Sequence, residues 1–390
     1  MGQREAGGGK STFAQTVVGR LASRGWVGAS GHCPEVDGAP TGWAWREMLQ
    51  QLGVPPAQAS AGGLDTTFDI ARQLADACRA DASAPGTVLV LDDAHRADGA
   101  TLQVLRIEAR ARRKQALALS RGLGDHDLEL TALTCWRAPV IWTIRRQRTA
   151  DAELITAMTD ALDHATGVQR VYLLVCAVFE LDGIDDRLAI ELAAQAVETA
   201  GRCDDPEALC AAWNARVYTA LGPDAAADLP AFADEFARAA QASGILAYQA
   251  AAHFFSFLAR AADTDLPGAA AEVQLGLRTA SSGRAGELVV VLSAFSAVLE
   301  VLGGDIDRAE HEYRELAGRL AAAGALNAAE IGLVGEMVIG WFRGSLAHLV
   351  EPLALVVDAA PAMVTWAYVV ALLDAGDVER ARPSRKTPCR

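Results

Sequence analysis

The spacing of hydrophobic residues divides the chain into two regions near residue 113. Residues 1–113 alternate between helical and strand patterns, with helices predicted over 11–24, 41–52 and 66–79 and strands over 26–29 and 87–91. In the first helix, Phe13, Val17 and Leu21 are expected on one helical face. The apolar run 87–91 follows a Pro-Gly turn and precedes two aspartates, which is typical of a strand buried on both faces of a parallel sheet. We therefore expect an α/β domain over residues 1–113.

Residues 114–382 show almost no strand pattern and consist of Ala- and Leu-rich segments separated by short acidic turns. The turns at Asp185, Asp224, Asp265 and Asp305 recur at steps of 39, 41 and 40 residues, and Ser345 and Asp377 follow after a further 40 and 32. Alanine stands four residues after most of them: Ala189, Ala269, Ala309 and Ala381, with Asp228 and Leu349 as exceptions. Such breaks join an apolar helix to an amphipathic one, and each pair must stack on the next. We expect an α-solenoid of tetratricopeptide-like type over 114–382, with a period longer than the strict repeat, and a disordered basic tail over 383–390.

A glycine-rich stretch near the N-terminus carries the strongest chemical signal. Gly7, Gly8, Gly9, Lys10, Ser11 and Thr12 lead directly into the first predicted helix. Glycines let backbone N–H groups turn toward bound phosphates, Lys10 would reach the terminal phosphates, and Ser11 would place its hydroxyl on Mg²⁺. The full phosphate-loop pattern begins with a glycine where this chain has Arg4. A glycine-rich linker beside a lysine is the alternative interpretation.

A second motif supports the phosphate-loop interpretation. Asp92 and Asp93 follow the apolar run 87–91, as expected at the end of a strand that holds Mg²⁺. We predict that Asp92 binds the metal, usually through water, and that Asp93 orients the attacking water as the catalytic residue. The predicted cofactors are therefore ATP and Mg²⁺, and the predicted fold is an incomplete P-loop NTPase sheet followed by a helical solenoid.

At residues 4–11 and 91–98 the sequence resembles the STAND-class signalling ATPases, and in particular the bacterial transcriptional activator regulators of the antibiotic-regulatory type. Residues 31–40 and 43–45 are similar to a segment that follows the phosphate loop in those proteins, and 141–143 and 151–154 to the start of their helical repeats. The resemblance implies an ATP-dependent switch: nucleotide at Lys10, Ser11, Asp92 and Asp93 favours an open, self-associating state. The repeats sense a protein partner or small-molecule effector, and a separate domain binds DNA.

The sequence departs from that family in ways that affect catalysis. Family members have a strand directly before the loop, whereas three residues precede Arg4, and the family's later strands, polar sensor residues and lid have no counterpart. Because hydrolysis needs charge stabilisation from several elements, we expect nucleotide binding with little or no turnover. Two alternatives stay open: an active ATPase, and a nucleotide-independent repeat scaffold.

The amino-acid composition limits the kinds of partner and the cellular compartment that are expected. The net charge of −14 argues against direct DNA binding by this chain, since a DNA-binding face is basic. Seven scattered cysteines without a Cys-x-x-Cys pair suit a reducing compartment, and no apolar run is long enough to span a membrane. A cytoplasmic protein with small buried cysteines is expected.

Several other side chains have a functional and a structural interpretation, and the structural one is preferred. His95 is expected at the surface or in packing contacts, and the basic residues 106–114 and 145–148 on solvated helix faces. Large aromatic residues are expected to form core between repeats: Trp136, Trp142, Trp213, Trp341, Phe254, Phe255 and Phe257. The sequence has no Ser-His-Asp or metal-ligand cluster at a recognisable spacing.

Overall fold

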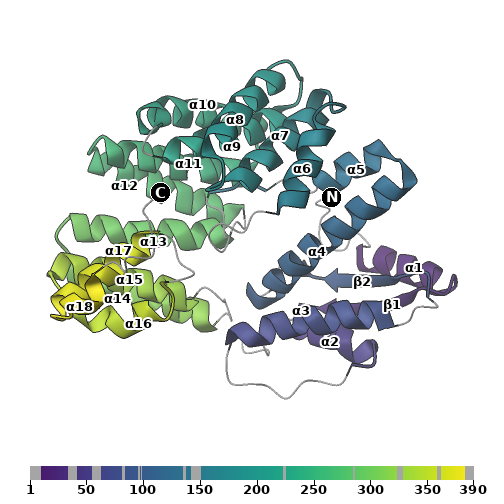
Figure 1. The fold of residues 1–390 in the computed structure, drawn as a ribbon, viewed down its shortest axis with the longest axis horizontal. Helices are drawn as coiled ribbons and strands as arrows, with labels where there is room; N and C mark the ends of the chain where they lie inside the picture. Colours follow the sequence, from purple (N-terminus) through teal and green to yellow (C-terminus); the bar gives the residue numbers. More distant parts are fainter. Residues whose placement is uncertain are drawn as a thin grey trace. The chain divides into compact units, whose positions relative to one another are not determined.

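The fold is given by a computed structural model. It describes residues 10–33, 42–54, 63–80, 84–94, 97, 99–134, 138–141, 151–222, 225–283, 286–322, 328–357 and 362–382. This part of the chain is mostly helical, with a small two-stranded parallel sheet near the N-terminus followed by a helical, repeat-like region (Figure 1). Packing divides the chain into an N-terminal unit (1–112 with 317–329) and a helical unit (113–316 with 330–390).

The N-terminal unit is built around strands β1 (Val27–His32) and β2 (Thr87–Asp92), which lie side by side in Figure 1. They pair in parallel from Val27 opposite Thr87 to His32 opposite Asp92. The helices are α1 (Lys10–Ala22), α2 (Trp43–Gln51), α3 (Gly63–Ala80) and α4 (Gly99–Leu123), which runs unbroken through residues 112 and 113. Because parallel strands need a crossover, α2 and α3 lie between the two strands in sequence.

Helices cover both faces of this sheet. On one face, Ala29 packs in a core with residues of α2 (Trp45, Met48, Leu49), α3 (Ile70, Ala71, Leu74) and α4 (Val104). The β1–α2 contact is so close that a Cβ on Gly31 would overlap the carbonyl oxygen of Ala44, which explains the glycine. On the other face, a Cβ on Gly28 would lie 2.7 Å from Cγ1 of Val18 in α1.

The outer edge of β1, on the side away from β2, is covered by side chains of α2; within the described ranges the sheet has no third strand. The Gln51 amide accepts a hydrogen bond from Ser30 N (2.9 Å) and donates one to Ser30 O (2.6 Å). Glu47 Oε2 accepts from His32 N at 2.9 Å. Backbone groups that would otherwise be unpaired are thereby satisfied.

One sequence prediction for this unit is wrong. All six residues of β2 are half-buried, although the apolar run predicted a strand buried on both faces. The physical reason is that the two described strands offer too narrow a surface to cover these apolar groups. The residues predicted on one face of the first helix differ in exposure: Phe13 is 72% exposed, whereas Val17 and Leu21 are half-buried.

The helical unit is a succession of helices, each packed on the next along the chain from α7 to α13. After α4 its helices are α5 (His126–Leu133), α6 (Ala152–Ala161), α7 (Gly167–Leu181), α8 (Asp186–Ala200), α9 (Pro206–Tyr218), α10 (Leu229–Ser243), α11 (Leu246–Ala262), α12 (Leu266–Ser282), α13 (Gly286–Leu302), α14 (Ile306–Ala322), α15 (Ala328–Arg343), α16 (Val350–Ala354), α17 (Ala362–Asp374) and α18 (Val378–Ala381). One continuous core extends from Leu117 to Leu292.

The acidic turns of the predicted repeat are helix starts. The carboxylates of Asp185, Asp265, Asp305 and Asp377 each accept a hydrogen bond from the backbone N–H three residues on, which caps α8, α12, α14 and α18. Ala189, Ala269 and Ala309, four residues after the first three caps, are buried, so neighbouring helices approach closely at the first turn. Asp224 lies outside the described residues, and α10 begins instead after Asp228, whose side chain makes no cap bond.

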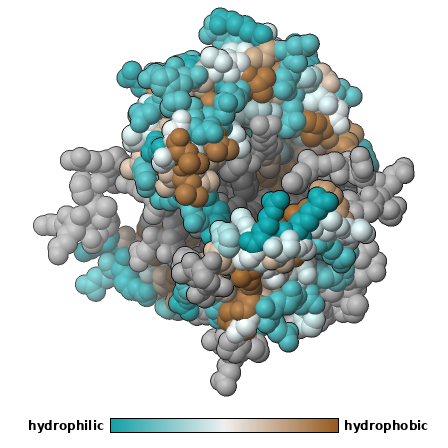
Figure 2. Space-filling model, turned by 90° about the vertical axis from the view of Figure 1, so that its right-hand side faces the viewer, coloured by the Kyte–Doolittle hydropathy of each residue, from teal (hydrophilic) through white to brown (hydrophobic). Residues whose placement is uncertain are grey.

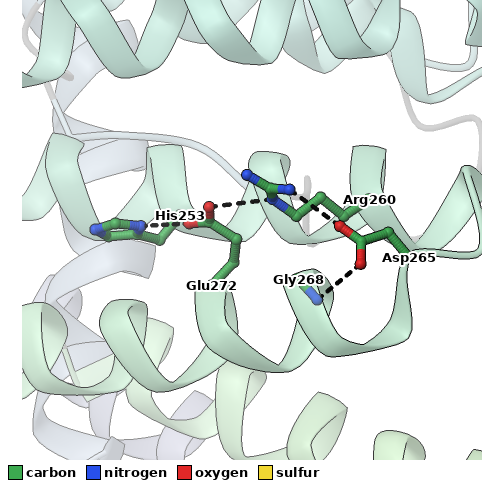
Figure 3. A network of polar contacts seen from close by, with 5 residues as sticks. All are labelled: His253, Arg260, Asp265, Gly268 and Glu272. Carbon is green, nitrogen blue, oxygen red and sulfur yellow. Dashed lines mark hydrogen bonds and ion pairs between the residues drawn. The ribbon is translucent and has the colours of Figure 1, made fainter.

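A polar network ties α11 to α12 (Figure 3). Glu272 bridges His253 Nδ1 at 2.8 Å and Arg260 Nε at 3.3 Å. Arg260 also donates to Asp265 Oδ2 at 3.0 Å while Asp265 Oδ1 accepts from Gly268 N, and this arrangement lowers the pKa of Asp265. The cap of α12 and the ion pair with Arg260 therefore share the carboxylate of Asp265.

Two further predictions need correction in the helical unit. Trp341 was expected in the core between repeats but is 59% exposed, because α15 ends two residues later and its last turn is not covered. Arg113 was expected on a solvated face, but it is largely buried. It donates to the carbonyl oxygens of Ala132 and Leu133 and pairs with Glu180 (3.4 Å), joining α4 to the end of α5 and to α7. Phe254, Phe255 and Phe257 are buried as expected.

The surface of the molecule carries both hydrophilic and hydrophobic side chains. On the face shown in Figure 2, hydrophilic residues predominate and hydrophobic ones form separate patches. Among the described residues, no helix has the length and apolar character required to cross a membrane. His95, Trp136, Trp142, residues 145–148 and the tail 383–390 lie outside the described residues.

Candidate functional site

The two strands of the N-terminal unit end at the same edge of the sheet. His32, the last residue of β1, is paired with Asp92, the last residue of β2, and Cys33 N donates to Asp92 O at 3.2 Å. In open α/β sheets, ligands bind outside the carboxyl ends of parallel strands. The predicted metal ligand and catalytic residue both lie at this edge.

Asp92 and Asp93 form a tight polar turn there. Asp92 Oδ1 accepts a hydrogen bond from Asp93 N at 3.0 Å. Asp93 has a φ of 50°, in the left-handed region that non-glycine residues rarely occupy. Such backbone strain is found preferentially at functional sites. The turn directs the Asp93 carboxylate across the strand ends.

The partner of Asp93 across the sheet is His32, which sequence reasoning did not single out. Asp93 Oδ2 lies 3.6 Å from His32 Nδ1, and both side chains are partly exposed. The backbone N–H of His32 donates a hydrogen bond to Glu47, which fixes the end of β1. The signal that would have found it is positional: it ends the strand that precedes β2 in sequence, and neighbouring parallel strands end together.

Helix α1 returns to the same edge. A tight turn at residues 23–26 reverses the chain between α1 and β1, with Trp26 N donating to Leu21 O at 3.1 Å. Val18 lies over Gly28, so α1 runs back along the strand. At about 1.5 Å per residue, the thirteen residues of α1 span about 20 Å, the length of a six-residue strand at about 3.3 Å per residue. The helix start at Lys10 therefore comes to the level of His32 and Asp92.

The remaining predicted site residues are only partly described. Gly7, Gly8 and Gly9 lie outside the described residues, as do the side chains of Lys10 and Ser11. Thr12 is exposed in the first turn of α1, where its carbonyl oxygen accepts from Thr16 Oγ1 at 2.7 Å. The structure brings Asp92 and Asp93 together with His32. The nearness of the start of α1 to them is inferred from the length and direction of the helix.

This arrangement combines an anion-binding and a cation-binding feature. The start of a helix carries free N–H groups and the positive end of the helix dipole, which favour a phosphate or carboxylate. Opposite it, Asp92 and Asp93 supply hard oxygen donors of the kind that Mg²⁺ takes, one or two at a time, while it keeps several waters. In the described part of the chain no three His, Cys, Asp or Glu side chains form a ready-made metal cluster.

Comparison with known proteins does not assign this site to a family. No protein-family model matches the sequence, and a search of curated proteins returns no match.

Proposed function

We propose that the N-terminal unit binds ATP with Mg²⁺ at the carboxyl edge of its sheet, and that the helical unit links this binding to a protein partner or small-molecule effector in the regulation of transcription. The observation that supports the proposal is the pairing of the ends of β1 and β2, His32 opposite Asp92, with Val18 of α1 lying over Gly28. From the length of α1 we infer that the start of this helix reaches the same level. The regulatory role rests on the sequence resemblance to STAND-class regulators.

In this proposal each predicted residue has one role. Backbone N–H groups of Gly7, Gly8 and Gly9 and of the first turn of α1, including Thr12, surround the phosphates, and Lys10 neutralises the terminal one. Ser11 and Asp92 hold Mg²⁺, Asp92 through water. Asp93, kept in place by its turn and by His32 at 3.6 Å, is positioned to orient a water molecule.

The proposal includes little or no turnover. Asp93 and His32 are partly exposed, and every residue of β2 is half-buried. Charges in contact with water stabilise a developing negative charge far less than charges in a closed, dry site. Binding can survive such exposure, whereas rapid phosphoryl transfer needs a closed site.

A nucleotide-independent scaffold is the second candidate, and one observation favours it. The helical unit has its own continuous core from Leu117 to Leu292. Repeat arrays are stabilised by contacts between neighbouring helices, so this unit needs no nucleotide to fold and present a surface to a protein. In either case the acidic chain is not expected to hold DNA itself.

The test is a measurement of Mg-ATP binding by isothermal titration and by thermal unfolding of the full chain. With Mg-ATP at about 100 times its Kd, the free energy of unfolding of the wild-type protein should rise by about 2.7 kcal/mol. Lys10→Ala should weaken binding at least tenfold, and Asp92→Asn should remove the dependence on Mg²⁺. Arg20→Ala, which removes an exposed cation from the other end of α1, serves as the matched control and should leave the Kd unchanged.

The outcomes separate the three functions. An unchanged transition and no heat of binding at millimolar Mg-ATP would sink the nucleotide proposal and leave the scaffold. Phosphate release that disappears in Lys10→Ala would establish an active ATPase instead. Binding without release, lost in Lys10→Ala and kept in Arg20→Ala, is the expected result.

A further inference from the structure

A small hollow in the helical unit brings together two histidines and two carboxylates that the nucleotide proposal does not use. Its volume is about 150 Å³, and it is lined by His126, Glu129 and Leu130 of α5 and by Asp160, Ala161 and His164 at the end of α6. This is smaller than the roughly 300–1,000 Å³ of sites for organic ligands. An ion with a few waters fits the space better than a metabolite.

The four polar residues come from two short segments with the same design. In α5, His126 and Glu129 are three residues apart and share a helix face, with Nδ1 of His126 3.7 Å from Oε2 of Glu129. At the end of α6, Asp160 and His164 are four residues apart. Each segment thus supplies one imidazole and one carboxylate to the same hollow.

The separation of the two rings suits one shared metal ion. Their centroids lie 5.4 Å apart at an interplanar angle of 38°. Two imidazoles bound to one tetrahedral zinc ion at about 2.0–2.1 Å have ring centres about 5 Å apart. The described residues contain no three side chains that already converge on a metal, so His126 and His164 must rotate. Rotation is easy because both are exposed, the side chain of His126 to 72%.

The surroundings favour a cation. Glu129 is largely buried and held by Arg121, whose Nε lies 2.7 Å from Oε1, which leaves Oε2 directed toward His126. The hollow also lies at the carboxyl end of α6, where the helix dipole is negative. Imidazole nitrogen with carboxylate oxygen is a donor set for zinc or a similar transition metal, whereas Mg²⁺ prefers oxygen alone.

We propose that His126 and His164, with Glu129 or Asp160 as third ligand, form a binding site for a divalent transition metal, typified by Zn²⁺, that ties the end of α6 to α5. The site is independent of nucleotide binding. It joins two helices that flank residues 135–150, and metal binding is therefore expected to stabilise the start of the helical unit.

The test is titration of the full chain with ZnCl₂, followed by calorimetry and by thermal unfolding. Wild-type protein should bind one Zn²⁺ that the double variant His126→Ala/His164→Ala loses, and each single variant should weaken it at least tenfold. Cysteines are unchanged in all variants, so binding that remains in the double variant measures thiol sites and is subtracted. His311→Ala is the matched control, because His311 is about as exposed as His126 and has a glutamate four residues on. Among the described residues, the ring contact between two histidines is the one of His126 with His164.

Three results would overturn the proposal: equal zinc binding by wild type and the double variant, equal loss in His311→Ala, or equal binding of Mg²⁺ at the same site. If an alanine variant alters the circular dichroism spectrum, His126→Gln and His164→Gln provide the same comparison with a polar side chain of similar size.

Discussion

The two units bury their hydrophobic residues to very different extents. In the helical unit, long runs of α7 and α11 are buried, and one core continues over more than half of the unit. In the N-terminal unit the most apolar strand, β2, is half-buried throughout and Phe13 is exposed. The difference follows from how the two architectures are stabilised. A helical array is covered by neighbours in sequence, whereas a sheet depends on lateral partners from distant segments.

The largest expected effect contrasts two phenylalanines. Phe255 is fully buried and makes edge-on ring contacts with Phe236 and Phe254. Phe255→Ala should lower the free energy of unfolding of the helical unit by about 3–5 kcal/mol. Phe13→Ala, at an exposed position of α1, should change stability by no more than about 0.5 kcal/mol. Urea unfolding followed by circular dichroism measures both, and a large loss for Phe13→Ala would mean that α1 is covered after all.

The next contrast concerns close packing inside the N-terminal unit. Gly31→Ala places a methyl group against the backbone of Ala44 and should cost about 1–3 kcal/mol, since neither β1 nor α2 can give way easily. Gly19→Ala, in α1 with open space around it, should instead add up to about 1 kcal/mol. Thermal unfolding of the two variants gives opposite shifts if the β1–α2 contact is as tight as described. Equal shifts would contradict it.

The third contrast is between two amide side chains that make the same two hydrogen bonds to a backbone residue but differ in burial. In the helical unit the Asn214 amide bonds both N and O of Val140 at 2.8 Å, as Gln51 does for Ser30 in the N-terminal unit. Asn214 is 1% exposed and Val140 is half-buried, so Asn214→Ala leaves partly buried backbone groups without this partner and should cost about 1–3 kcal/mol. Gln51 is exposed, and water can replace it at a cost of about 0.5–1.5 kcal/mol. Chemical denaturation of both variants tests whether burial sets the difference.

The effect that is smallest at neutral pH is a loss of stability of the helical unit that appears only at alkaline pH. Burial raises the pKa of Cys210 from 9.0 to about 12 and that of Tyr313 from 10.0 to about 12. Since the folded state then keeps protons that the unfolded state has lost, stability is complete below pH 9 and decreases as the pH rises from 9 toward 12. Melting temperatures across this range should fall less steeply in Cys210→Ala and Tyr313→Phe. An unchanged slope in both would exclude these two groups as the cause.

Features set by residues close in sequence could be predicted, whereas features set by residues far apart in sequence could not. The helix starts at Asp185, Asp265 and Asp305 were predictable, because a cap and the alanine four residues later belong to one turn. The strand that ends at Asp92 was predictable from five consecutive apolar residues before two aspartates. The burial of Arg113 was not, since its partners Ala132, Leu133 and Glu180 lie 19 to 67 residues away.

The candidate sites show the same limit. The paired aspartates were visible as a motif, but the contact of Asp93 with His32 depends on the register between β1 and β2. The contact of His126 with His164 depends on how α5 packs on α6, since the two histidines are 38 positions apart in sequence.

By itself, the sequence determined the approximate positions of the first three helices and of the two strands, and the helix starts at Asp185, Asp265, Asp305 and Asp377, because hydrophobic period, caps and turns act over a few residues. Tertiary structure alone decided how deeply β2 and Phe13 are covered, which edge of β1 is closed by α2, and which polar groups face one another. Those outcomes depend on contacts between segments far apart in the chain, whose register and distance no local pattern contains.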